Sequence, residues 1–258
     1  MMRIVLTMKP RTNPHVPIEA EKINPAFLMW GTDDLTVWEG NKERRLDEVF
    51  EVEVEGKATS VNEVEVVLRG DTSRVKRVGE YMDGGKITVE GDVGMHCGNF
   101  MAAGTIEVMG DAGGWFAREM RGGTITCHGN VGHYCAAGYR GEKKGMRGGK
   151  VEVFGNAGDF TAEHLFGGEV VVHGNCGDMP GVDMQGGYLT IHGNCARPCG
   201  NMTKGKCTVL GCVSGMIPTF KTEGEVEGPD GLPLTHFTGD VANRGKGNLL
   251  VRHYQYLD

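Results

Sequence analysis

The sequence predicts an all-β protein, a parallel, right-handed β-helix (a solenoid) of about seven to eight short coils with a mixed N-terminal cap and an extended C-terminal tail. The first observation is a phrase, Met-x-Gly-Gly-x-φ-x-φ-x-Gly-Asp/Asn-φ-Gly with φ aliphatic or Cys, that recurs seven times. The phrase begins at Met82, Met101, Met120, Met146, Leu165, Met184 and Met202, so the spacing is 19 residues except for one of 26 and one of 18. A fixed short period is typical of stacked units that bury their apolar faces against one another.

The second observation is the alternation inside each phrase, where two apolar residues flank a polar one between glycine corners. Such period-2 segments predict short strands, and units of this length without a helical stretch suit a parallel β-helix. The methionines that open the phrases are expected to fill the corners, and glycines such as Gly84 and Gly85 to supply the tight turns. Two columns of side chains should face the core: Ile87, Ile106, Ile125, Val151, Val170, Leu189 and Cys207, and Val89, Val108, Cys127, Val153, Val172, Ile191 and Val209.

Three regions follow from where the phrase starts and stops: an N-terminal cap region at 1–62, the repeat β-helix at 63–215 and a C-terminal extension at 216–258. Val64–Leu68 looks like a degenerate first coil. The extension is polar except near its end, at Leu249–Val251, and so few apolar residues scarcely fold alone. We therefore expect the extension to wrap the repeats or a partner protein.

Composition limits the class of protein. The formal net charge of −7, without a basic cluster beyond Lys143 and Lys144, argues against nucleic acid as a partner. No apolar run approaches the roughly 18 residues of a membrane helix and no signal peptide is apparent, so we predict a cytoplasmic protein. The eight cysteines include two in the core columns and two, Cys176 and Cys195, at a small apolar site of the repeat. We expect them to be small buried hydrophobes in a reducing compartment rather than disulfides.

No motif assembles a catalytic, cofactor-binding or metal-binding set, and we predict none in this chain. The stretch from Gly200 to Lys206 resembles a phosphate-binding loop, but Cys207 stands where Ser or Thr is required and the lysine begins a repeat strand. Four cysteines near the end of the repeats have the spacing of neither a ferredoxin cluster nor a zinc ribbon: Cys195, Cys199, Cys207 and Cys212.

One outward-facing repeat position combines histidines with apolar residues: Glu90, Met109, His128, Phe154, His173, His192 and Leu210. Histidines on adjacent coils can hold a metal, but this column offers no consistent ligand set. Outward apolar side chains on a repeat surface predict that the C-terminal extension or another protein covers them. An autonomous enzyme working in a groove of the repeats is the alternative, and it would require paired carboxylates on an outward column, which the alignment does not provide.

The 26-residue spacing marks an insertion of seven residues, in the segment 136–145 between Cys135 and Met146. Insertions in solenoids leave as loops on one face, often the binding face. As candidate partner contacts we name residues of this loop together with two aromatic residues one coil earlier: Trp115, Phe116, Tyr139, Arg140, Lys143 and Lys144. A solvated loop without a partner is the alternative interpretation.

The run from Gly98 to Gly110, Gly-Asn-Phe-Met-Ala-Ala-Gly-Thr-Ile-Glu-Val-Met-Gly, carries a family resemblance, as do 120–129, 146–155 and 184–193 from their methionines onward. These repeats resemble the C subunit of formylmethanofuran dehydrogenase, the tungsten or molybdenum enzyme complex of methanogenic archaea. The segment Pro17–Pro25 is similar to that family as well. The β-helix also resembles the C-terminal domain of the glutamate synthase large subunit and the C subunit of the bacterial formyltransferase/hydrolase complex.

The resemblance implies a non-catalytic scaffold subunit of an oxidoreductase complex that reversibly reduces CO2 and couples it to methanofuran. The product is N-formylmethanofuran, in the first step of methanogenesis from CO2. It implies no cofactor in this chain, because a tungsten or molybdenum pterin, iron–sulfur clusters and a dinuclear metal site belong to other subunits. The implied partners are a pterin-binding, formate-dehydrogenase-like subunit, an amidohydrolase-like subunit and iron–sulfur subunits, with neither nucleic acid nor a membrane. The C subunit of a formyltransferase/hydrolase complex and a glutamate-synthase-like domain stay open as alternatives.

Overall fold

The regular structure of the protein is almost entirely strand. The computed structural model describes residues 1–256, in which helical turns are confined to α1 (Pro25–Leu28), α2 (Leu46–Val49), η1 (Val61–Glu63) and η2 (Val241–Asn243). The all-β prediction is therefore confirmed. A small sheet pairs β2 (Ile18–Glu19), β3 (Thr36–Glu39), β4 (Lys42–Arg45) and β7 (Val75–Lys76). A sheet of 14 strands contains β1 (Met2–Met8), β5 (Phe50–Gly56), β6 (Val64–Arg69), β8 (Asp83–Val89), β9 (Ala103–Val108), β10 (Thr124–Cys127), β11 (Lys150–Val153), β12 (Glu169–Val172), β13 (Gln185–Ile191), β14 (Cys195–Ala196), β15 (Lys204–Met216), β16 (Lys221–Glu227), β17 (Pro233–Gly239) and β18 (Gly247–Tyr256).

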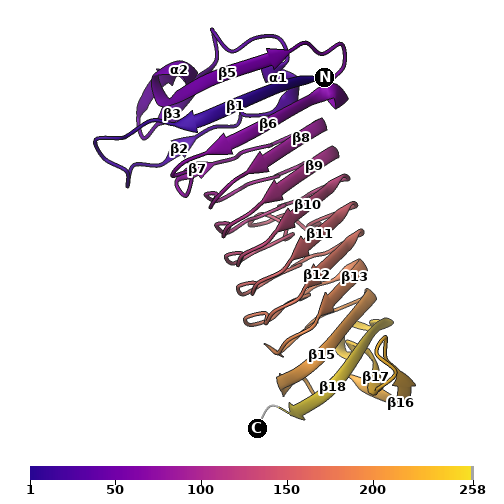
Figure 1. Cartoon of the computed structure of the whole chain (residues 1–258). Helices are drawn as coiled ribbons and strands as arrows, with labels where there is room; N and C mark the ends of the chain where they lie inside the picture. The colour runs from indigo at the N-terminus through magenta and orange to yellow at the C-terminus, as the bar shows by residue number, and fades with distance from the viewer. Residues whose placement is uncertain (257–258) are drawn as a thin grey trace.

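One strand from each repeat stands in a long row that separates the two termini (Figure 1). Neighbouring strands pair in parallel and in register, so Ile106 of β9 lies between Ile87 of β8 and Ile125 of β10. A second ladder of parallel bridges runs beside this row and joins Val93, Ala112, Val131, Ala157 and Cys176. Each repeat thus touches the next through a strand and through a separate bridge.

The core is a stack of similar layers, one from each repeat. Both predicted core columns and the corner methionines, with Leu165 in their place once, are completely buried. Burying apolar surface in this way is the main favourable contribution to folding, at about 25 cal/mol per Å2. Because each layer is covered only by its neighbours, the repeats stabilise one another.

A ladder of Asp and Asn side chains explains the polar residue of the phrase. The Oδ1 atom of Asp92 accepts a hydrogen bond of 2.8 Å from the N–H of Asp111. The same bond recurs at each following repeat, with donor–acceptor distances of 2.6–2.9 Å, along Asp111, Asn130, Asn156, Asn175, Asn194 and Cys212. Each such bond contributes roughly 1 kcal/mol, so the ladder adds a polar seam to the apolar core.

Between the bridge residue of each repeat, such as Ala112, and the next strand, the backbone takes a left-handed conformation at every second residue. Trp115 and Ala117 have φ values of 61° and 56°. The N–H of Trp115 donates forward to the carbonyl of His133, whereas the N–H of Ala117 donates back to the carbonyl of Cys97. Alternate N–H groups therefore reach opposite neighbours, which satisfies the backbone of a segment that is neither helix nor strand.

The terminal regions extend the same sheet. Strand β1 pairs in parallel with β6 and antiparallel with β5, so the N-terminal region continues the row of repeats. At the other end β18 pairs in parallel with β15, and β17 and β16 follow antiparallel (Figure 1). Leu249 and Val251 of β18 are completely buried. The C-terminal extension thus packs on the last repeat and adds three strands, β18, β17 and β16, to the long sheet.

Candidate partner interface

The first half of the insertion loop is held at Tyr139 by an aromatic and cationic cluster. The ring of Tyr139 lies 5.1 Å from that of Trp115, and the Arg118 guanidinium carbon lies 4.7 Å from the centre of the Tyr139 ring. The N–H of Tyr139 also donates to Oε1 of Glu119 at 3.4 Å. These contacts position the start of the loop on the preceding repeat.

The other end of the loop is held by the following repeats. The ammonium of Lys144 lies 4.1 Å from the centre of the Phe166 ring, and Nε2 of Gln185 donates to the carbonyl of Lys143 at 2.5 Å. Arg140 and Glu142, which lie between the two ends in sequence, are exposed. The loop therefore presents charged side chains from two fixed ends.

Aromatic rings from successive repeats form a stack beneath the loop. Trp115 lies parallel to Tyr134 at 4.3 Å between ring centres, Tyr134 to Phe160 at 5.1 Å and His96 to Trp115 at 6.2 Å. Aromatic pairs of this kind contribute about 0.5–1.5 kcal/mol beyond the burial of area. The stack gives this edge of the repeats a rigid, partly exposed surface.

The structure corrects one of the predicted contact residues. Phe116 is completely buried in the core and therefore contributes no direct contact to a partner. Trp115 is only 8% exposed and lies in the aromatic stack, whereas Tyr139, Arg140, Lys143 and Lys144 are exposed. Adjacent residues differ because the alternating left-handed backbone turns one of them inward and the next along the surface.

A buried polar cluster under the loop was not predicted. The Asn99 side-chain amide lies 3.1 Å from Nδ1 of His96, and Arg118 lies 4.5 Å above the ring of Phe100. Burial raises the pKa of Glu80 and, with the nearby Arg118 charge, lowers the pKa of His96 to about 4. Within residues 1–256, Oδ1 of Asn99 and Nε of Arg118 have no hydrogen-bond partner. Glu80, Asn99 and Arg118 occupy the same position in successive repeats, two residues before the methionine, where the repeat phrase does not extend. The phrase therefore carries no signal for this cluster.

The outward column of histidines and apolar residues forms a second stack on the open face of the long sheet. Ring centres of His128, Phe154, His173 and His192 follow one another at 5.1, 4.7 and 4.8 Å. Nε2 of His173 lies 3.0 Å from Oε1 of Glu152, and the hydrogen bonds from His173 and Lys150 lower the pKa of that carboxyl. With Met109 and Phe154 each almost half exposed, the predicted outward orientation is confirmed.

This column leads to a cavity of about 590 Å3 between the sheet and the β16–β17 hairpin. Apolar side chains such as Leu210 and Leu234 line it together with Tyr188 and His192. Volumes of this size are typical of ligand pockets and of grooves for a partner's side chains. The C-terminal hairpin therefore covers only the end of the column.

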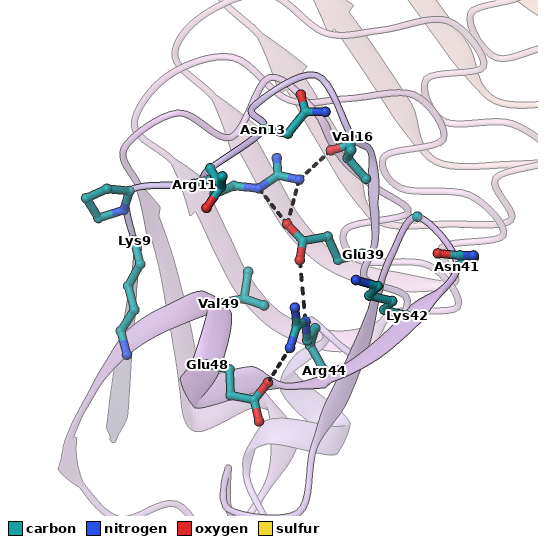
Figure 2. Close-up of a pocket in the computed structure, with 13 residues that line it drawn as sticks. Lys9, Arg11, Asn13, Val16, Glu39, Asn41, Lys42, Arg44, Glu48 and Val49 are labelled. Atoms are coloured by element: carbon teal, nitrogen blue, oxygen red, sulfur yellow. Dashed lines mark hydrogen bonds and ion pairs between the residues drawn. The ribbon is translucent and has the colours of Figure 1, made fainter.

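A hollow in the N-terminal region is lined by four cationic side chains and two carboxylates. Its volume is about 620 Å3, and Figure 2 shows Arg11 and Arg44 on either side of Glu39. Nε of Arg11 donates to Glu39 at 3.2 Å, and Arg44 lies 3.5 Å from both Glu39 and Glu48. Lys9 donates instead to the carbonyl of Asp47. This hollow can bind polar groups, but the residues that line it include no nucleophile beside a base.

The cysteines do not suit a metal cluster. Cys195, Cys199 and Cys207 are buried, burial raises the pKa of Cys195, and hydrogen bonding with Cys199 together with burial raises the pKa of Cys207. Iron–sulfur and zinc sites bind the thiolate, which this environment disfavours. No group of three or more His, Cys, Asp or Glu side chains with metal-binding geometry occurs among the residues that the structure describes.

Comparison with known proteins assigns a class to this arrangement. The chain is similar to the C subunit of formylmethanofuran dehydrogenases of both the molybdenum and the tungsten type, as the repeat phrase predicted. It is 40% identical over 93 residues to the molybdenum-containing enzyme 1 subunit of Methanothermobacter wolfeii, covering 34% of this chain and 22% of the relative. It is 36% identical over 102 residues to the tungsten-containing enzyme 2 subunit of Methanothermobacter thermautotrophicus, covering 38% and 37%. The chain thus spans between about a fifth and two fifths of the length of these curated relatives.

A solved structure matches nearly the whole chain. It is a chain of the formyltransferase/hydrolase complex FhcABCD of Methylorubrum extorquens in complex with methylofuran, with a TM-score of 0.85 and 26% sequence identity. The match covers 96% of this chain and 98% of that chain. Protein-family models give no match. No helix within residues 1–256 is long and apolar enough to span a bilayer.

Proposed function

We propose that this chain is a non-catalytic scaffold subunit of a formylmethanofuran dehydrogenase complex. The observation that carries the proposal is the full-length similarity to a chain of a multi-subunit formyl-transferring complex, together with 36–40% identity in the repeats to dehydrogenase subunits. The repeat region, 63–215, acts as a parallel β-helix between the cap at 1–62 and the extension at 216–258. Its flat sheet face and its insertion loop supply the contacts with other subunits.

The complex catalyses the reversible reduction of CO2 and the formation of N-formylmethanofuran in the cytoplasm, at centres in other subunits. Those subunits hold a tungsten or molybdenum pterin, iron–sulfur clusters and a dinuclear metal site. The buried thiols of this chain support a role without cofactors of its own, because metal and cluster sites bind the thiolate. Exposed apolar and aromatic side chains along the outer column support contact with neighbouring subunits.

A second candidate is the corresponding subunit of a formyltransferase/hydrolase complex. The observation that favours it is the coverage of 98% of the chain from the Methylorubrum complex, whereas the two dehydrogenase alignments extend over at most 38% of this chain. In this alternative the partners carry formyl transfer and hydrolysis, and no tungsten or molybdenum subunit is present.

Anaerobic affinity purification of the tagged full chain from its native cells tests both candidates. Co-elution of a pterin-binding subunit with tungsten or molybdenum, and formylmethanofuran-dependent dye reduction in the eluate, is the expected result. Co-elution of formyltransferase and amidohydrolase-like subunits without either metal would favour the second candidate. An eluate that contains this chain alone would overturn the scaffold role.

A further inference from the structure

Five cations around the insertion loop lack a counter-charge. Within the part of the chain that the structure describes, none of them forms an ion pair, and all are exposed: Arg121, Arg140, Lys143, Lys144 and Arg147. The one carboxylate among them, Glu142, is exposed and also unpaired within residues 1–256. We call these five residues the basic ridge. Its sign opposes that of the whole chain, whose formal net charge is −7.

The basic ridge is continuous because of the repeat register. The N–H of Arg147 donates to the carbonyl of Met120 and the N–H of Arg121 to that of Met101, so the two arginines occupy one position in adjacent repeats. Phe166 and Gln185 hold the same position in the next two repeats. Adjacent strands lie about 4.8 Å apart, so Arg121, Arg147 and Phe166 form a row of roughly 10 Å.

The loop adds its charges to the end of this row. The ammonium of Lys144 lies over Phe166, the neighbour of Arg147 in the row, and Gln185 holds the backbone carbonyl of Lys143. At the opposite end Arg121 lies 5.7 Å from the ring of Phe100. Arg121 and Lys144 are therefore held in place before a ligand binds, which reduces the loss of affinity to the ordering of these two side chains.

The charge and length of the basic ridge indicate which class of ligand it binds. Two arginines on adjacent repeats repel each other in the free chain, and carboxylates placed between them would remove that cost. Arginine beside exposed aromatic rings is also the composition typical of protein–protein contact centres. A nucleic acid fits less well, because a row of roughly 10 Å spans few phosphates and the rest of the chain is acidic.

From these contacts we infer that the basic ridge docks an acidic segment of a partner subunit. Asp or Glu carboxylates of that segment pair with Arg121 and Arg147, while an apolar or aromatic side chain packs on Phe166 and Tyr139. The inference rests on the proposed function in one respect, that a partner subunit exists. It names the surface and the chemistry of the contact.

The direct test measures binding of a labelled peptide to the full chain by fluorescence anisotropy. The probe is a Glu-rich peptide of about eight residues with one Phe, long enough in extended form to cover the row. The wild-type chain is expected to bind it, and binding should weaken as salt rises, because exposed charges are screened. The Arg121→Gln/Arg147→Gln variant should bind about tenfold more weakly.

The control variant removes the same charge elsewhere. Lys204→Gln/Lys206→Gln replaces two exposed lysines of β15 that form no ion pair within residues 1–256, and it should change the affinity less than about twofold. Equal losses in both variants, or no peptide binding by the wild type, would overturn the inference. Tighter binding of a single-stranded oligonucleotide of the same charge would overturn it too, in favour of a nucleic-acid site.

Affinity purification of the wild type and of the double variant from native cells tests the docking site and the scaffold role independently. If wild-type chain and the Arg121→Gln/Arg147→Gln variant recover partner subunits in equal yield, the scaffold role stands and the docking site is wrong. A selective loss of one partner in the variant supports the docking site. If the wild type recovers no partner at all, the proposed function fails and the inference fails with it.

Discussion

Each repeat has a glycine just before its strand or within the strand's first residues, and the missing side chain leaves room for the preceding repeat. At Gly149 φ is 89°, and a Cβ atom would lie 2.7 Å from the carbonyl oxygen of Gly123. Gly141, in the insertion loop, has a φ of 88° but no atom within 4 Å of such a Cβ. These two glycines share a backbone conformation and differ in crowding, so together they separate the two effects.

Gly149→Ala is expected to destabilise the protein much more than Gly141→Ala. The left-handed conformation costs an alanine about 1 kcal/mol at either position. At Gly149 the overlap with the neighbouring backbone adds roughly 2 kcal/mol or more, because a carbonyl cannot move aside without breaking its ladder. Urea unfolding followed by tryptophan fluorescence measures both losses. Equal losses in the two variants would show that crowding at the corner is unimportant.

His96 makes stability depend on pH. Burial first, and then the charge of Arg118, lowers the pKa of this ring to about 4, whereas an unfolded histidine titrates near pH ~6.5. As the pH falls from 6.5 toward 4, the unfolded chain binds a proton that the folded chain does not. The free energy of unfolding therefore decreases in this window and is unaffected by His96 above it.

His96→Asn removes the titrating group and keeps a residue that tolerates the left-handed backbone, with φ of 69°. Between pH 7 and pH 5 the wild type should lose about 1–2 kcal/mol more stability than the variant. Urea unfolding at both pH values gives the difference. A variant as sensitive to pH as the wild type would assign the effect to other groups.

At the scale of elements, the insertion loop between β10 and β11 is held against the repeats at both ends. Tyr139 fixes one end on Trp115 and Arg118, and Gln185 and Phe166 fix the other. The loop contains three trypsin cleavage sites, after Arg140, Lys143 and Lys144. Proteolysis there depends on local opening, which these contacts oppose.

Tyr139→Ala is expected to increase the rate of tryptic cleavage in the loop several-fold while leaving global unfolding nearly unchanged. The lost ring contacts are worth about 1–2 kcal/mol locally, which multiplies the open population by roughly 5 to 30. Mass spectrometry of timed digests locates the cuts. Tyr188→Ala, at an exposed tyrosine of β13 without a stacking partner among the described residues, is the control. A similar acceleration in the control would mean that the loop is not held by Tyr139.

At the scale of the whole molecule, one hydrophobic core runs from Met2 to Val251 without a break. Its last layer is closed by β18, which covers the β15 edge that a further repeat would otherwise occupy. An uncovered edge strand is a template for association with other chains. The C-terminal extension therefore keeps the row of repeats finite.

Val251→Asp is expected to open this end of the molecule. A carboxylate at a completely buried position costs more than about 3 kcal/mol, and exposure of β15 should produce association that grows with concentration. Light scattering with urea unfolding detects both effects. Asn248→Asp places the same charge on an exposed position of the same strand and should have little effect. Aggregation of the control to the same extent would attribute association to charge alone.

The sequence by itself determined the repeating parts of this protein. Strand positions, both buried columns and the corner methionines follow from the period, because every repeat places equivalent residues in the same local environment. The exposed insertion loop and the outward orientation of Met109 and Phe154 follow from the same register. The similarity to formylmethanofuran dehydrogenase subunits was also carried by the phrase alone.

Only the tertiary structure decided the features that join unlike positions. Trp115 lies in the aromatic stack and Phe116 in the core because the backbone alternates in handedness, which strand parity does not describe. Arg118 contacts Tyr139 of the insertion loop, which has no equivalent in the other repeats. Strand β18 pairs with β15 although a hairpin separates them in sequence, because the open edge of β15 and its uncovered apolar surface favour that pairing. Such contacts depend on surfaces that exist only after the repeats have stacked, so a local pattern in the chain does not encode them.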